Sequence, residues 1–127
     1  VIPDEETDIK YIVPDHYSKN KVNKPLRESI SGLDLRNWPH RQIIMSSAKS
    51  DGALILSNEG RVLDVACMIS EPNADALTAC GKSELKKFSG ARSTAAWNAS
   101  TRGVAIKVSE DGPITIYNHG DLIAQVG

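Results

Sequence analysis

Three polar segments of this chain combine residue types that bind phosphate and divalent cations. They are residues 51–53, 90–96 and 109–112, and each adjoins a run of apolar residues. Carboxylates supply oxygen ligands for hard cations, whereas arginine, hydroxyls and the backbone amides of a glycine-containing loop bind phosphate oxygens. Together the three segments contain the groups that hold a polyphosphate and its metal ion.

Asp51 stands directly before the apolar run 53–56, with Gly52 between them. A carboxylate at the start of a buried strand stays near solvent, so it can coordinate a divalent metal and polarise a ribose hydroxyl. The same residues also suit an ordinary turn, in which glycine adopts a backbone conformation that other residues avoid. Asp51 taken alone fits the turn better than the metal site.

The segment 90–94 supplies two kinds of phosphate ligand. Backbone amides at a helix start, which Gly90 would open, point at a bound anion and are favoured by the helix dipole. Arg92 adds a bidentate donor, and Ser93 and Thr94 add hydroxyls. Simple helix capping explains these residues equally well, because Ser and Thr are preferred cap residues.

The segment 109–112 follows the apolar run 104–108 and has the same two interpretations. Ser109 offers a hydroxyl to phosphate, and Glu110 and Asp111 offer carboxylates to a metal ion. A polar hairpin turn uses the same residue types. Taken alone, the segment fits the turn better.

The composition favours one soluble globular domain. The chain has 127 residues, of which 40% are hydrophobic and 24% charged, and this is enough to build one core. An aromatic share of 5% argues against a stacking platform for single-stranded nucleic acid, and a net charge of -1 gives no general attraction for DNA or anionic membranes. We therefore expect no nucleic-acid partner, and local clusters must carry any anion binding.

The remaining reactive side chains predict no separate site. Cys67 and Cys80 lack the paired spacing of a zinc site and are too few for a disulfide scaffold, so we expect buried, reduced thiols. The three histidines are scattered along the chain. Lys82, Lys86 and Lys87 form a modest basic group that suits either phosphate or a solvated face.

The sequence lacks the signals of membrane insertion or export. No apolar stretch approaches the roughly 20 residues that cross a bilayer, and no basic and apolar leader opens the chain. We therefore expect a cytoplasmic location and no membrane segment in this chain. Because the sequence starts without Met, we also expect an excised domain or processed fragment.

The first half of the chain predicts a loose N-terminal segment followed by helices. Residues 1–22 are expected to form a polar lead-in with a short strand at 11–13, and residues 23–127 to form the domain. Asn23 would cap the first helix of that domain, which has proline in its first turn. A second, shorter helical segment is expected over 43–48.

The second half alternates apolar runs with turn residues and short helical patterns. This alternation predicts a single α/β domain with a central mixed, twisted β-sheet flanked by helices. The expected strands are 53–56, 62–69, 104–108, 114–117 and 122–124, and the expected helices are 71–77 and 92–99.

In their order and spacing, the three polar segments resemble the diadenylate cyclase domain, the N-terminal domain of DisA and its relatives. The resemblance covers roughly residues 45–126. Residues 51–53 match the family's Asp-Gly-Ala motif, 90–96 stand in place of its Gly-Thr-Arg-His-Arg-Ala-Ala motif, and 108–111 in place of its Val-Ser-Glu-Glu segment. Three matches in order are far more specific than any one of them.

The resemblance implies that the domain joins two ATP molecules into cyclic di-AMP and releases pyrophosphate. It also implies a divalent metal, Mg²⁺ or Mn²⁺, and one ATP per subunit, with a facing copy of the same domain needed for turnover. Asp51, Glu110 and Asp111 would hold the metal, Asp111 being a shorter substitute for the family's second glutamate. Phosphoryl transfer of this kind depends mainly on positioning and electrostatics.

The resemblance also implies roles for residues that contact the nucleotide. Asp51 would activate the attacking 3′-hydroxyl, Gly52 would let the backbone approach the nucleotide, and Ala53 would be a further nucleotide-binding residue. Met68 and Ile69 occupy the region where relatives give apolar contacts to adenine.

The phosphates would lie against the other two segments. Arg92 would clamp phosphate or flank the base, and Ser109 would donate a hydrogen bond to phosphate. Gly90, Ser93 and Thr94 would line the same nucleotide site.

Two departures from the family pattern weaken the prediction of activity. Relatives carry His and a second Arg where this chain has Ser93 and Thr94, and one lost charge-assisted contact costs about 1.5–3 kcal/mol. The family's Leu-Pro-Leu-Ser turn is replaced by residues 68–72, which affects adenine specificity. Three functions therefore remain: a divergent cyclase, a catalytically degenerate nucleotide-binding or sensory module, and a structural or protein-interaction domain.

Overall fold

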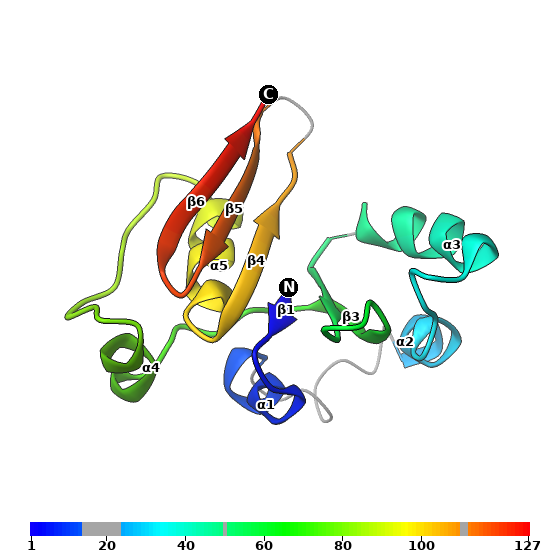
Figure 1. Cartoon of the computed structure of the whole chain (residues 1–127), viewed down its shortest axis with the longest axis horizontal. Helices are drawn as coiled ribbons and strands as arrows, with labels where there is room; N and C mark the ends of the chain where they lie inside the picture. The colour runs from blue at the N-terminus through cyan, green and yellow to red at the C-terminus, as the bar shows by residue number, and fades with distance from the viewer. Residues whose placement is uncertain (14–23, 50, 110–111) are drawn as a thin grey trace.

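The structure is a computed structural model, and it describes residues 1–13, 24–49, 51–109 and 112–127 of the chain. Helices and strands follow one another in small groups along the chain (Figure 1). In order they are β1 (Ile2–Pro3), a 3₁₀ turn η1 (Glu6–Asp8), α1 (Ile9–Ile12), α2 (Lys24–Ile30), α3 (Trp38–Ala48), β2 (Ala53–Leu56), β3 (Val62–Cys67), α4 (Ala74–Ala79), α5 (Ala91–Ser100), β4 (Gly103–Lys107), β5 (Ile114–Asn118) and β6 (Asp121–Val126).

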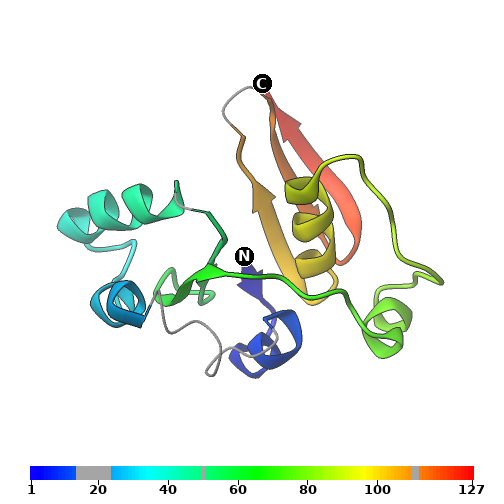
Figure 2. The ribbon, with the colours of Figure 1, turned by 180° about the vertical axis from the view of Figure 1, so that it is seen from behind.

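A four-stranded antiparallel sheet in the order β1-β4-β5-β6 forms one part of the molecule. Helix α5 covers one face of this sheet, behind it in Figure 1 and in front of it in Figure 2. The face toward α5 is built from alternate residues of the strands, such as Ala105 and Tyr117, which pair across β4 and β5 and are both buried. Trp97 of α5 is also buried, and its indole N–H donates to the carbonyl of Gly120 at 2.8 Å.

The hairpin of β2 and β3 forms the second part, with α2 and α3 packed against it (Figure 1). Its core consists of four buried aliphatic residues. Ile30 comes from α2, Ile44 from α3, and Val62 and Val65 from β3. Arg27 of α2 donates two hydrogen bonds to the carboxylate of Asp64 in β3, at 2.7 and 3.0 Å. A bidentate charged pair thus fixes α2 on the hairpin.

The first three residues join the two parts. Ile2 and Pro3 pair antiparallel with β4, while Val1 N donates to the carbonyl of Leu54 at 2.7 Å and Leu56 N donates to the carbonyl of Val1 at 2.8 Å. Val1 thus donates to one residue and accepts from the residue two positions further along β2. This is the hydrogen-bond pattern of parallel strands. The predicted single α/β domain with β-structure flanked by helices is confirmed. Its strands form one four-stranded and one two-stranded sheet, both antiparallel, and the bonds of Val1 connect the two.

The prediction of a loose lead-in is wrong for residues 1–13. Pro3, Ile12 and Val13 are buried, and 11–13 is not a strand, because α1 ends at Ile12. Apolar residues at positions 9, 12 and 13 have the spacing of one helix face, which favours a helix over a strand here. The rest of the lead-in and the expected Asn23 cap lie outside the described residues.

The other expected elements are present, β2 with the expected ends and the rest with shifted ends. The helix expected over 43–48 begins earlier, at Trp38, and is longer than α2 rather than shorter. The strand expected over 62–69 ends at Cys67, and the helix expected over 71–77 starts later, at Ala74. The cause of the later start is Asn73, whose side-chain oxygen accepts a hydrogen bond from Ala76 N at 2.9 Å and so caps α4.

Candidate functional site

The start of α5 carries its polar residues inside the first turn rather than at the cap. Gly90 is the N-cap residue, and no side chain caps the helix there. The hydroxyl of Thr94 donates back to the carbonyl of Gly90 at 3.0 Å. Capping by Ser93 or Thr94 therefore does not explain these residues, and no described side chain accepts a hydrogen bond from the first-turn amides.

A side-chain contact links this helix start to the end of β4. Lys107, the last residue of β4, donates from Nζ to the Oγ of Ser93 at 3.1 Å. Ser109 follows two residues later and is half-buried. The structure thus joins the predicted segment 90–94 to the end of β4, two residues before Ser109.

Ser109 lies against Gly112, whose missing side chain leaves room for it. A Cβ atom at Gly112 would lie 2.7 Å from the Ser109 Oγ. Glu110 and Asp111, the expected metal ligands between them, lie outside the described residues.

Asp51 is exposed and lies apart from the other two segments. Helix α3 and helix α5 are drawn on opposite sides of β4 (Figures 1 and 2). Among the described residues, no hydrogen bond or ion pair joins Asp51 to Arg92 or Ser109. Arg92 is exposed as well, in the first turn of α5.

The residues that follow Asp51 are fixed by the hairpin. Gly52 has a φ of +93°, and a Cβ atom there would lie 2.6 Å from the carbonyl carbon of Ala66. Ala53 pairs with Cys67. Gly52 therefore brings two backbones into contact, which is a structural reason for glycine beside whatever role it has toward a nucleotide.

The two residues expected near adenine differ in burial. Met68 follows β3 and is 74% exposed, whereas Ile69 packs partly buried against the core beneath α5. Met68 is accessible to a ligand. Ile69 already has packing partners in the protein.

Sequence reasoning missed Lys107 as a candidate. Its signal is a single charged residue within the apolar run 104–108. Lys107 is two residues after the buried Ala105, so both lie on the face of the sheet toward α5. Thr115, which pairs with Lys107 in register, is also buried, and its Oγ1 has no hydrogen-bond partner among the described residues.

The described residues contain no group of three or more His, Cys, Asp or Glu side chains that could hold a metal ion. Of the three expected metal ligands, Asp51, Glu110 and Asp111, the structure describes Asp51. Both cysteines are free, and burial raises the pKa of the Cys67 thiol, which disfavours the thiolate that metals and electrophiles need. In the described part of the chain, no helix has the length and apolar character to cross a bilayer.

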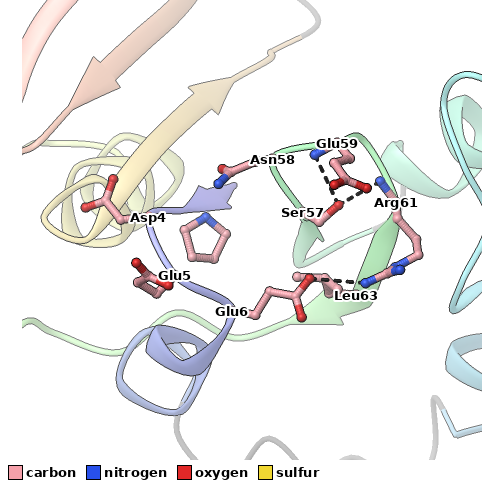
Figure 3. Close-up of a pocket in the computed structure, with 9 residues that line it drawn as sticks. Asp4, Glu5, Glu6, Ser57, Asn58, Glu59, Arg61 and Leu63 are labelled. Atoms are coloured by element: carbon pink, nitrogen blue, oxygen red, sulfur yellow. Dashed lines mark hydrogen bonds and ion pairs between the residues drawn. The ribbon is translucent and has the colours of Figure 1, made fainter.

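A pocket of about 270 Å³ lies elsewhere, between the segment after β1 and the turn of the β2–β3 hairpin (Figure 3). Its lining includes the carboxylates of Asp4, Glu5, Glu6 and Glu59 and one cation, Arg61, which pairs with Glu6 at 3.2 Å. This excess of negative charge repels phosphate, so the pocket is not a triphosphate site.

Comparison with known proteins gives one match. The family model described as DisA bacterial checkpoint controller nucleotide-binding matches residues 11–122, which is most of the chain and includes all three polar segments. No curated protein and no solved structure matches this chain. The chain therefore belongs to the DisA nucleotide-binding, diadenylate cyclase domain family.

Proposed function

We propose that this domain binds ATP where α5 starts and β4 ends, and that two such domains condense two ATP molecules into cyclic di-AMP. The observation that supports the site is the contact between Lys107 and Ser93, which joins the segment 90–96 to the end of β4, two residues before Ser109. Family membership supports the nucleotide as ligand. Open amides, Arg92 and Lys107 provide positive potential there for a triphosphate.

The proposed reaction consists of two phosphoryl transfers. In each, the 3′-hydroxyl oxygen of one ATP attacks the α-phosphorus of the other. The bond from that phosphorus to the leaving pyrophosphate breaks, and the hydroxyl proton is released to water. Since one ATP is held per subunit, a facing copy of the domain brings the second.

The donor chemistry of Asp51 fits a divalent cation. Its carboxylate is exposed and has no ion-pair partner among the described residues, and Mg²⁺ is commonly held by one or two carboxylates together with substrate phosphates. When bound, Mg²⁺ or Mn²⁺ stabilises charge on the phosphates. We propose Glu110 and Asp111 as its further ligands.

The test is to incubate the purified protein with ATP and either MgCl₂ or MnCl₂ and to identify the products by mass. We expect cyclic di-AMP and pyrophosphate. Asp51→Asn should abolish the product while ATP still binds, and Asp75→Asn, an exposed carboxylate on α4, should leave the product unchanged. Absence of product with both metals, while ATP binds, would reject cyclase activity.

A second function, nucleotide binding without turnover, is favoured by two observations. Neutral hydroxyls replace the family's cations at Ser93 and Thr94, and no hydrogen bond or ion pair among the described residues joins Asp51 to Arg92 or Ser109. Under this function, calorimetry detects ATP or cyclic di-AMP binding while no product forms. If neither ligand binds, both functions fail, and an interaction domain remains.

A further inference from the structure

Lys107 differs from the other half-buried cations of the molecule. Where the structure describes the burial of Lys and Arg side chains, four of them are half-buried and the rest are exposed. Three of the four have a carboxylate partner: Asp64 for Arg27, Asp121 for Lys82 and Asp8 for Arg102. Lys107 has no carboxylate within 4.0 Å among the described residues.

The contacts of Lys107 leave its charge uncompensated. Its one described hydrogen bond goes to the neutral hydroxyl of Ser93. An ammonium group has three N–H donors, so two remain for another acceptor. A partly desolvated charge without a counter-ion is unfavourable, and an anionic ligand removes that penalty.

Thr115 is a second polar residue without a described partner beside Lys107. It stands opposite Lys107 in the pairing of β4 and β5, on the same face of the sheet, and it is 3% exposed. Its Oγ1 is buried without a hydrogen-bond partner among the described residues. Most buried hydroxyls have a hydrogen-bond partner, so a buried hydroxyl without one is rare.

We propose that Lys107 is a phosphate-binding residue, and that it supplies from β4 the positive charge that the start of α5 lacks. The expected ligand group is the terminal phosphates of a nucleoside triphosphate, held between Lys107, Arg92 and the first-turn amides of α5. Ser93 and Thr94, which replace cations of the family, are small enough to leave room for this lysine. This inference rests on the proposed ATP site.

The first test compares ligand affinities by calorimetry. Lys107→Gln should weaken ATP binding roughly 10- to 100-fold, the range expected for one charge-assisted bond, and should leave adenosine binding unchanged. Lys107→Arg should keep most of the affinity. Lys86→Gln is the matched control, because Lys86 is exposed and lies over the Phe88 ring, so ATP affinity should not change.

The outcomes separate this inference from the proposed function. If the unchanged protein fails to bind ATP, the proposed site is wrong and the inference falls with it. If it binds ATP and Lys107→Gln binds equally well, the inference alone is overturned.

A second test uses the unchanged protein and does not depend on the folding of a variant. Lysines are acetylated with a mild reagent in the presence of ATP or adenosine, and each site is followed by mass spectrometry. ATP should slow acetylation of Lys107 several-fold relative to adenosine, whereas Lys86 and Lys87 should react equally in both. Equal rates at Lys107 would contradict the inference.

Discussion

Arg92 and Lys107 approach the proposed phosphate site from different elements, and they differ in how they are held. Arg92 is exposed in the first turn of α5, whereas Lys107 is half-buried under that helix and bonded to Ser93. An exposed arginine contributes to ligand binding with little effect on folding. A variant of Arg92 therefore reports on the site rather than on stability.

We expect Arg92→Ala to reduce ATP affinity about 10-fold or more, because it removes a charge-assisted, bidentate donor. Calorimetry measures the affinity, and thermal unfolding should be unchanged. The control is Arg41→Ala, because Arg41 is exposed on α3 and stacks on Trp38. Equal ATP affinity of Arg92→Ala and the unchanged protein would place Arg92 outside the nucleotide site.

A second prediction at this scale concerns acid stability. Hydrogen bonds from the Arg36 side chain, and then from its backbone, lower the pKa of Asp34 from 3.8 to about 2. Because the folded pKa lies below the unfolded value, the ionised carboxylate stabilises the fold above about pH 4, and this contribution is lost as the pH falls toward 2.

Titration of the Asp34 carboxyl by NMR should give the lowered pKa, and Arg36→Gln should move it back toward 3.8. The effect on stability should be small, since the pair is close to the surface. A pKa that does not respond to Arg36→Gln would refute this account.

At the scale of elements, the β2–β3 hairpin positions Asp51 through one close approach of two backbones. Gly52 lies against the backbone of Ala66 and has a positive φ, and Ala66 itself has a φ of +56°. The pairing is irregular between Ala53 and Ile55. Backbone strain is common at functional sites, and here it adjoins the predicted Asp-Gly-Ala motif.

We expect Gly52→Ala to destabilise the fold by about 2–4 kcal/mol, because the added Cβ overlaps Ala66 and the backbone conformation is strained. Gly32→Ala is the matched control: Gly32 has a φ of +87°, but nothing lies within 4 Å of the added Cβ. Its cost should be the backbone strain alone, about 1 kcal/mol. Equal losses in chemical denaturation would show that the contact with Ala66 does not matter.

At the scale of the whole molecule, the first three residues connect the two β structures. They bond β2 on one side and β4 on the other, and Gly103 of β4 allows this close pairing. A Cβ atom at Gly103 would overlap the carbonyl oxygen of Ile2 and lie 2.8 Å from the Cα of Pro3. The relative placement of Asp51 and the start of α5 therefore depends on this contact.

We expect Gly103→Ala to displace β1, to destabilise the protein by about 2–4 kcal/mol and to speed hydrogen exchange at the amide of Leu56, which donates to Val1. Gly81→Ala is the control, since no atom lies within 4 Å of its added Cβ. If exchange at Leu56 stays as slow as before, β1 does not hold the two parts together.

The sequence predicted the features that depend on neighbouring residues. Apolar runs with turn residues between them indicated β2, β3 and the β5–β6 hairpin, and ordered short motifs indicated the family. Each of these signals is local, because strand alternation, turn chemistry and motif spacing involve residues close in the chain.

Only the tertiary structure decided how distant segments meet. Val1 bonds to Leu54 and Leu56 through backbone atoms, whose hydrogen bonding is independent of side-chain type, so no residue pattern signals it. The bond from Lys107 to Ser93 depends on α5 packing over the side of β4 that Lys107 occupies. Such contacts arise from the packing of whole elements, and a linear pattern does not contain that information.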